Sequence, residues 1–169
     1  MSAAASDTRS RPLYTPNQRA RRDATVWTLV QGILAPIQFL VCAVSLVLVL
    51  RYLMTGEGYA AATVSILLKT ALLYTIMVTG AIWEKVVFGQ YLFAPAFFWE
   101  DVVSFGVIAL HTIYLYGLLT ETLTPLQLML VTLAAYATYF VNATQFLLKL
   151  RRARLDSGSA LPADGGQPA

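Results

Sequence analysis

The chain has 169 residues, a net charge of +3, 57% hydrophobic residues and only 12% charged residues. Soluble domains average about 25% charged residues, whereas only eight charged residues lie between positions 26 and 148 of this chain. So apolar an interior excludes an ordinary soluble globule, a disordered chain and a nucleic-acid-binding module, and it indicates a membrane protein.

Cysteine and histidine are each present once, as Cys42 and His111. One cysteine forms no disulfide within the chain and no CxxC site, and one histidine excludes a bis-histidine haem site built within one chain. No GxGxxG, P-loop or HExxH motif is present, so the sequence shows no nucleotide or metal motif.

Four apolar segments follow one another along the chain. Residues 1–25 are a basic tail that is expected to become interfacial or helical near Asn17. About 20 apolar residues span a bilayer as a helix, and the predicted spans are 26–50, 60–82, 102–119 and 126–148. Residues 149–169 are basic at first and then expected to be disordered. The predicted fold is therefore an all-α, four-helix membrane domain over residues 26–148, with a polar tail on each side.

The charges also predict how these spans are oriented. An even number of spans puts both ends of the domain on one side, and both ends carry the arginine and lysine clusters. Basic segments next to membrane helices normally stay in the cytoplasm, so both termini are expected there. The loops at 52–59 and 120–125 would then face outward, and the segment 83–101 would face the cytoplasm.

Each span carries polar or small residues on one helical face, three or four positions apart. Polar groups are costly in hydrocarbon and normally face the protein interior, which predicts a partly polar bundle core. Packing alone also explains amide and small residues, and Lys69 fits an ion pair or an outward-snorkelling side chain as well. The predicted interior positions include Gln31, Gln38, Cys42 and Ser45, then Lys69, Gly80 and Glu84, then Glu100, Ser104 and His111, and finally Asn142, Gln145 and Lys149.

The segment 83–101 is the most informative part of the sequence. It reads WEKVVFGQYLFAPAFFWED, an uncharged aromatic run with an acid–base pair at one end and two acids at the other. The run is too short to span a membrane and too apolar for a free loop, so it is expected to be interfacial or re-entrant. An aromatic belt at the headgroup level explains the rings. The acids favour a mouth for a flat, membrane-soluble aromatic ligand.

Three stretches, RRDATVWTLVQGILAPIQFL, MVTGAIWEKVVFGQYLFAPAFFWEDVVS and AAYATYFVNATQFLLKLR, resemble the vinyl bacteriochlorophyllide hydratase family of phototrophic bacteria. This family is also called chlorophyllide a 3-vinyl hydratase, and the likeness covers roughly residues 12–152. It implies a hydro-lyase of bacteriochlorophyll biosynthesis. The enzyme would add water to the C3 vinyl group of chlorophyllide a, or of a 3-vinyl bacteriochlorophyllide, to give the 3-(1-hydroxyethyl) derivative.

Vinyl hydration requires a general acid, a positioned water and a base. A carboxylic acid buried at the membrane boundary beside a second acid would supply the proton. We expect Glu100 to be this donor, because it shares a helix face with His111, whereas Asp101 is turned about 100° away. Asp101 would supply the neighbouring charge and Glu84 would act as base. Because the reaction is redox-neutral, no cofactor and no metal beyond the substrate's own magnesium is expected.

The substrate offers a propionate, a central magnesium and a flat aromatic surface. Lys85 or the basic tail clusters would pair with the propionate, and neutral His111 would ligate the magnesium. Aromatic contacts are expected from Tyr91, Phe98 and Trp99. The resemblance further implies a multi-pass protein of the bacterial inner membrane, cytoplasmic or intracytoplasmic. Its candidate partners are the lipid bilayer and other enzymes of the pathway, with no nucleic acid.

Two other functions stay open at this stage. A non-catalytic pigment carrier or assembly protein needs the aromatic mouth and His111 but not three carboxylic acids. A small transporter or proton relay would explain Lys69 and the polar faces, although the acids gather at one end of the spans.

Overall fold

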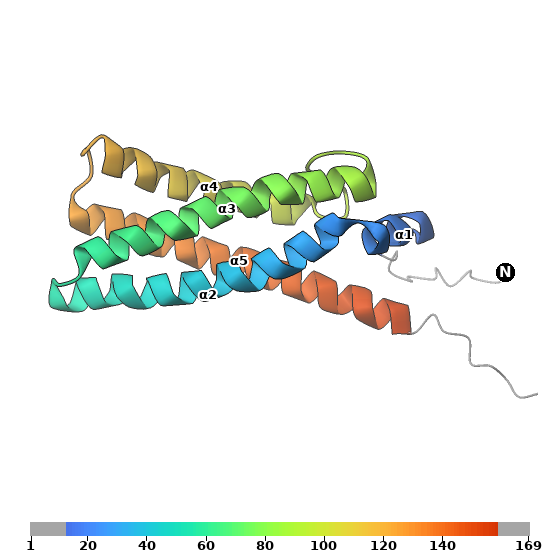
Figure 1. Ribbon diagram of the computed structural model, residues 1–169, viewed down its shortest axis with the longest axis horizontal. Helices are drawn as coiled ribbons and strands as arrows, with labels where there is room; N and C mark the ends of the chain where they lie inside the picture. The colour runs from blue at the N-terminus through green and yellow to red at the C-terminus, as the bar shows by residue number, and fades with distance from the viewer. Residues whose placement is uncertain (1–12, 159–169) are drawn as a thin grey trace, which may run out of the picture.

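The computed structural model describes residues 13–158, and every regular element in that part of the chain is a helix. Four long helices form an elongated antiparallel bundle, preceded by one short helix (Figure 1). They are α1 (Pro16–Ala24), α2 (Val26–Thr55), α3 (Tyr59–Phe88), α4 (Phe98–Leu119) and α5 (Pro125–Gly158). Each of the four from α2 to α5 contains a stretch long and apolar enough to cross a membrane. The all-helical, four-span prediction is therefore confirmed.

Local sequence explains where the helices begin and end. Thr15 and Gln18 form a reciprocal capping box that starts α1, which satisfies amides that the first helical turn leaves unpaired. Gly56 and Gly89 follow α2 and α3 with φ of 74° and 89°. Glycine adopts this left-handed conformation without a steric penalty, so each helix ends where a glycine permits it.

The helices are longer than the predicted spans. Residues 83–88 complete α3 and residues 98–101 begin α4, so only 89–97 connects them without regular structure. The α5 helix likewise continues past position 148 into the segment expected to be a tail. The length of an apolar run reflects only the thickness of the hydrocarbon layer. A helix is often longer, because it continues until its backbone is capped. The remaining parts of both predicted tails, 1–12 and 159–169, lie outside the described residues.

The bundle consists of two helical hairpins. α2 packs along α3 and α4 packs along α5, while the two hairpins touch each other over shorter stretches. Side-chain hydrogen bonds follow the same division, for example from Gln31 Nε2 to Thr79 Oγ1 within the first hairpin. Between the hairpins, Ser45 Oγ and Tyr136 Oη lie 2.6 Å apart. The seam between the hairpins is therefore the less tightly bound interface.

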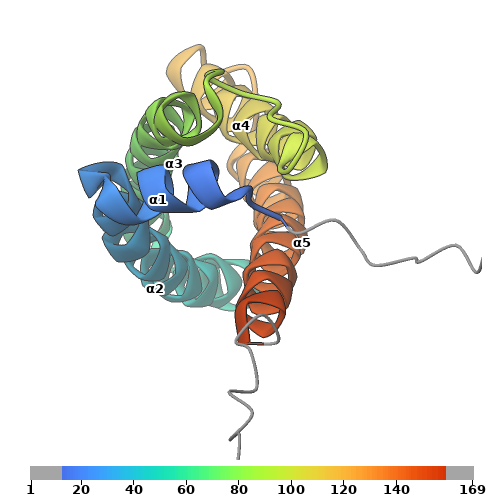
Figure 2. The ribbon, with the colours of Figure 1, turned by 90° about the vertical axis from the view of Figure 1, so that its right-hand side faces the viewer.

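Three buried clusters follow one another along the bundle axis. The cluster around Val49 and Tyr114 lies toward the short turns, and that around Cys42 and Tyr136 lies in the middle. The third, around Tyr14 and Phe97, lies where α1, the 89–97 connection and the end of α5 meet. Figure 2 views this end, with α1 lying across the four long helices. The described chain begins and ends at this end of the bundle. The acids predicted to be functional lie here too.

Candidate active site

Two buried carboxyl groups from different helices meet at the end of the bundle. Glu84 lies in the last turns of α3 and Asp101 in the first turn of α4, and both residues are 4% exposed. The two side chains lie within reach of each other and interact directly. Because two carboxylates are both acceptors, a hydrogen bond between them requires a proton on one of them. The arrangement therefore suits one proton shared by this pair.

The connection between α3 and α4 holds the pair from the other side. The Phe93 amide donates to Asp101 Oδ2 at 2.7 Å and the Ala94 amide donates to Glu84 Oε2 at 3.1 Å. Phe93 has a φ of 58°, a left-handed conformation that costs a non-glycine residue on the order of 1 kcal/mol. The carboxyl groups and the two amides therefore fix each other's positions.

Glu100 has different partners from its neighbour Asp101. Its carboxylate forms an ion pair with Lys149 of α5, and the same ammonium also donates to the Ala96 carbonyl. Asn142 Nδ2 donates to the Glu100 carbonyl at 2.8 Å, and Ser104 Oγ donates to Asn142 Oδ1 at 3.3 Å. Glu100 thus anchors the start of α4 to α5 as a carboxylate facing a cation.

This arrangement bears on the expected roles of the acids. A 100° turn per residue sends the Asp101 side chain toward α3 and the Glu100 side chain toward α5, so the two neighbours contact different partners. The partner that shares a proton with Asp101 is Glu84, which comes from the other hairpin. The sequence pointed to all three acids, but their pairing depends on how the hairpins meet.

The aromatic residues of this region divide into an inner and an outer set. Phe97 is buried, and its ring packs against Tyr14, Trp83, Phe88 and Phe146. Burial raises the pKa of the Tyr14 hydroxyl, opposed by the nearby Arg22. The outer set, Tyr91, Phe98 and Trp99, is exposed. The inner set is core packing, and the outer set is free to contact other molecules.

Lys85 lies beside one of these exposed rings, whereas His111 lies apart from them. Lys85 Nζ donates to the Gly89 carbonyl at 2.8 Å at the end of α3, and it lies 5.3 Å from the Tyr91 ring centroid. His111 is fully buried deeper in the bundle, where its Nδ1 contacts the Val107 carbonyl at 2.8 Å. The five residues predicted to bind substrate therefore occupy two places, one at the bundle end and one inside it.

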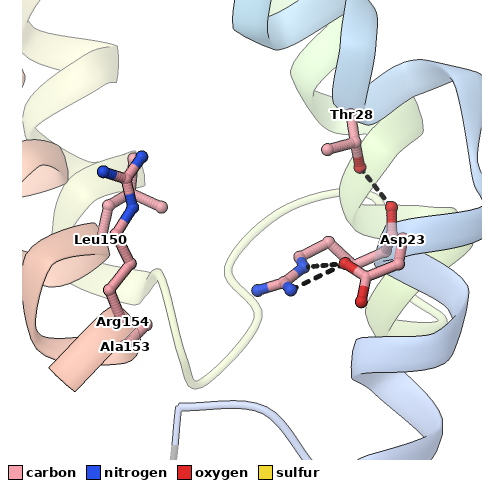
Figure 3. Close-up of a pocket in the computed structure, with 6 residues that line it drawn as sticks. Asp23, Thr28, Leu150, Ala153 and Arg154 are labelled. Carbon is pink, nitrogen blue, oxygen red and sulfur yellow. Dashed lines mark hydrogen bonds and ion pairs between the residues drawn. The ribbon is translucent and has the colours of Figure 1, made fainter. Parts of the chain in front are cut away.

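A pocket of about 410 Å³ opens between the hairpins at the same end (Figure 3). Arg22, Asp23 and Thr28 form one wall, where Arg22 pairs with Asp23 at 2.7 Å. The opposite wall belongs to α5 and includes Arg154. The basic clusters are visible in the sequence, but their placement on opposite walls of a pocket depends on how the helices pack.

Known proteins are similar in sequence over nearly the whole described region. Residues 14–152 match the family model described as 2-vinyl bacteriochlorophyllide hydratase (BCHF). Proteins of that name from Cereibacter sphaeroides and Rhodobacter capsulatus are 77% and 74% identical to this chain. The alignments cover 89% and 87% of this chain, and 93% and 85% of those relatives. No solved structure matches. This chain, with its paired buried acids, belongs to the 2-vinyl bacteriochlorophyllide hydratase family.

Proposed function

We propose that Glu84 and Asp101 are the acid and base with which this chain hydrates the vinyl group of a bacteriochlorophyllide. Family membership carries the reaction class, since the chain is a hydratase of bacteriochlorophyll biosynthesis. The observation that carries the residue assignment is the meeting of two buried carboxyl groups, each held by a backbone amide of the same connection. Older tetrapyrrole numbering calls this vinyl position 2, and current numbering calls it 3.

A pair with one shared proton is sufficient for the whole reaction. The vinyl π electrons take the proton, which forms a C–H bond at the terminal carbon and leaves a cation on the carbon next to the ring. A water oxygen then bonds to that carbon, and its proton returns to the carboxylates. The pair ends as it began, and the product has gained one water. Between the steps, both carboxylates are charged and stabilise the cation.

Glu100 has a positioning role in this proposal. Its ion pair with Lys149, together with the Asn142 bond to its carbonyl, fixes the first turn of α4. Asp101 lies in that same turn, so the direction of its carboxyl group depends on these contacts. Because the Glu100 carboxylate is already paired with Lys149, the proposal assigns the proton transfer to the Glu84–Asp101 pair.

The exposed aromatic side chains and Lys85 suit a first contact with the pigment. Tyr91, Phe98 and Trp99 lie at the bundle end, where rings of this kind favour the boundary between lipid and water. A chlorin in the membrane would meet these faces before it reaches the acids. We assign Lys85 to the same surface, where its ammonium would attract the substrate's carboxylate.

The proposed setting is the bacterial inner membrane, cytoplasmic or intracytoplasmic. The four apolar helices support a membrane protein, and the arginine-rich ends favour cytoplasmic termini. The reaction as written needs no added cofactor, and other enzymes of the pathway are proposed neighbours.

Conversion of pigment by the purified chain tests this function. Chlorophyllide a is incubated with the detergent-solubilised protein in water labelled with heavy oxygen, and the product is analysed by mass spectrometry. A labelled 3-(1-hydroxyethyl) product supports the hydratase. Binding of pigment without conversion would instead make the chain a carrier, which is the alternative that the acids disfavour.

A further inference from the structure

The middle of the bundle holds three polar side chains that each have at least one polar atom without a hydrogen-bond partner. They are Gln38 of α2, Lys69 of α3 and His111 of α4, and all three are almost completely buried. Both polar atoms of the Gln38 amide, Lys69 Nζ and His111 Nε2 make no hydrogen bond in the described part of the chain. Buried polar groups are nearly always paired, so this region has the character of a site whose occupant is absent.

These three side chains belong to one region. Lys69 is close enough to interact electrostatically with His111 and with Cys42, which lies one helical turn from Gln38. Two α5 rings close the region, with Tyr136 centred 6.0 Å from the His111 ring and Tyr139 centred 3.5 Å from Lys69 Nζ. All four long helices therefore contribute.

The histidine presents a lone pair to this region. Its Nδ1 contacts the Val107 carbonyl, which only accepts hydrogen bonds, so Nδ1 carries the hydrogen. In the neutral ring Nε2 is then the unprotonated nitrogen. A metal-ligating histidine has this arrangement, with one nitrogen held by a carbonyl and the other free to bind.

The lysine presents the opposite chemistry. Lys69 is 0% exposed, so it does not snorkel, and no ion pair joins it to any residue among 13–158. An ammonium has donors and no acceptor capacity, and the Tyr139 ring face beside it accepts none of its hydrogen bonds as an anion would. The region thus combines a free metal ligand with a free anion partner.

We propose that this region binds the magnesium chlorin substrate, with His111 Nε2 on its central metal and Lys69 paired with its propionate carboxylate. This assignment rests on the proposed function. His111 follows Asp101 by ten residues on α4, so the two residues are about 15 Å apart along the helix. The propionate and the vinyl group are on different pyrrole rings, so a pigment held at His111 and Lys69 would extend along the bundle toward the acid pair.

The two-hairpin architecture supplies a path to this region. The seam between the hairpins is the weaker interface, and the pocket between Arg22 and Arg154 opens into it at the bundle end. A flat macrocycle that slides between the hairpins separates helices that are already loosely joined. Arg154 is then the matched control, because it would hold the carboxylate if the pigment stayed in the outer pocket.

Pigment titrations with the full-length chain in detergent test this proposal. Chlorophyllide a, its metal-free form and its methyl ester are each titrated by absorption and fluorescence. We expect His111→Leu to weaken binding of the magnesium pigment at least about 10-fold and to leave the metal-free pigment unaffected. We expect Lys69→Met to weaken binding of the free-acid pigment by a similar factor and to leave binding of the methyl ester unchanged. Lys69→Arg should restore part of the affinity for the free acid.

Other outcomes overturn the proposal. If His111→Leu weakens binding of the magnesium pigment and of the metal-free pigment equally, the histidine only packs. If neither affinity changes, the histidine faces internal water. If Arg154→Ala weakens binding of the free-acid pigment and Lys69→Met does not, the carboxylate lies in the outer pocket. Product formation is measured separately, so hydration without this binding pattern refutes only the inference, and binding without hydration refutes only the proposed function.

Discussion

Replacing Glu84 by glutamine removes the shared proton while keeping the shape of the side chain. The glutamine oxygen still accepts the Ala94 amide that now binds Glu84 Oε2, and its NH₂ group donates to Asp101. Asp101 accepts that bond as a carboxylate, so the pair no longer holds a proton to donate to the vinyl group.

The expected effects on rate and stability differ in size. Loss of positioned acid–base catalysis lowers kcat about 10²- to 10⁴-fold, equivalent to about 3–5 kcal/mol of activation free energy. The free energy of unfolding changes by only about 1 kcal/mol, because a buried hydrogen bond is exchanged for another of similar strength. Turnover is followed by pigment absorption and unfolding by circular dichroism, with the exposed Glu57→Gln as the matched control.

The variant Glu100→Gln decides between the two candidate acids. It breaks the ion pair with the partly exposed Lys149, so it lowers stability by about 1–3 kcal/mol and reduces turnover less than Glu84→Gln. If Glu84→Gln turns over at nearly the wild-type rate while Glu100→Gln loses 100-fold, the reasoning is refuted and Glu100 is the acid.

Four further outcomes are expected. The pH–rate profile is bell-shaped, because raising the pH removes the shared proton and lowering it protonates the base; a single-limbed profile contradicts the pair. Reporter fusions are cytoplasmic at the C-terminus and external after Glu57, and the reverse at either position excludes the four-span orientation. The purified chain hydrates its pigment without added cofactor, and a strict nicotinamide requirement would contradict the mechanism. Gly117→Ala lowers the Tm, because its Cβ would lie 2.4 Å from the Leu123 side chain, whereas Gly32→Ala, which meets nothing within 4 Å, does not.

Helical periodicity was sufficient to find the interior of the bundle. The predicted third-span positions, from Glu100 through His111, are all buried, and so are Gln38, Lys69 and Asn142 on the other helices. Polar residues repeated at helical spacing in an apolar sequence have few other places to lie. The snorkelling alternative for Lys69 is excluded by its complete burial.

The contacts between those residues could not be predicted from the sequence. Glu100 and Asp101 are neighbours in the chain, but helical rotation directs them to different helices, and their partners Lys149 and Glu84 are distant in sequence. The left-handed Phe93 has no sequence signal either, because a bulky residue adopts that conformation only when its surroundings impose it. Such contacts depend on the tertiary arrangement rather than on local preference.

The two-hairpin architecture makes the site a property of association rather than of either half. Glu84 and Lys69 belong to the first hairpin, and Asp101 and His111 to the second, so neither contains a complete proton pair or a complete pigment site. Each hairpin keeps its backbone hydrogen bonds when the two separate. Detergents or bilayers that weaken the seam should therefore abolish hydration while helicity persists, which makes enzyme activity a more sensitive measure of assembly than the circular dichroism signal.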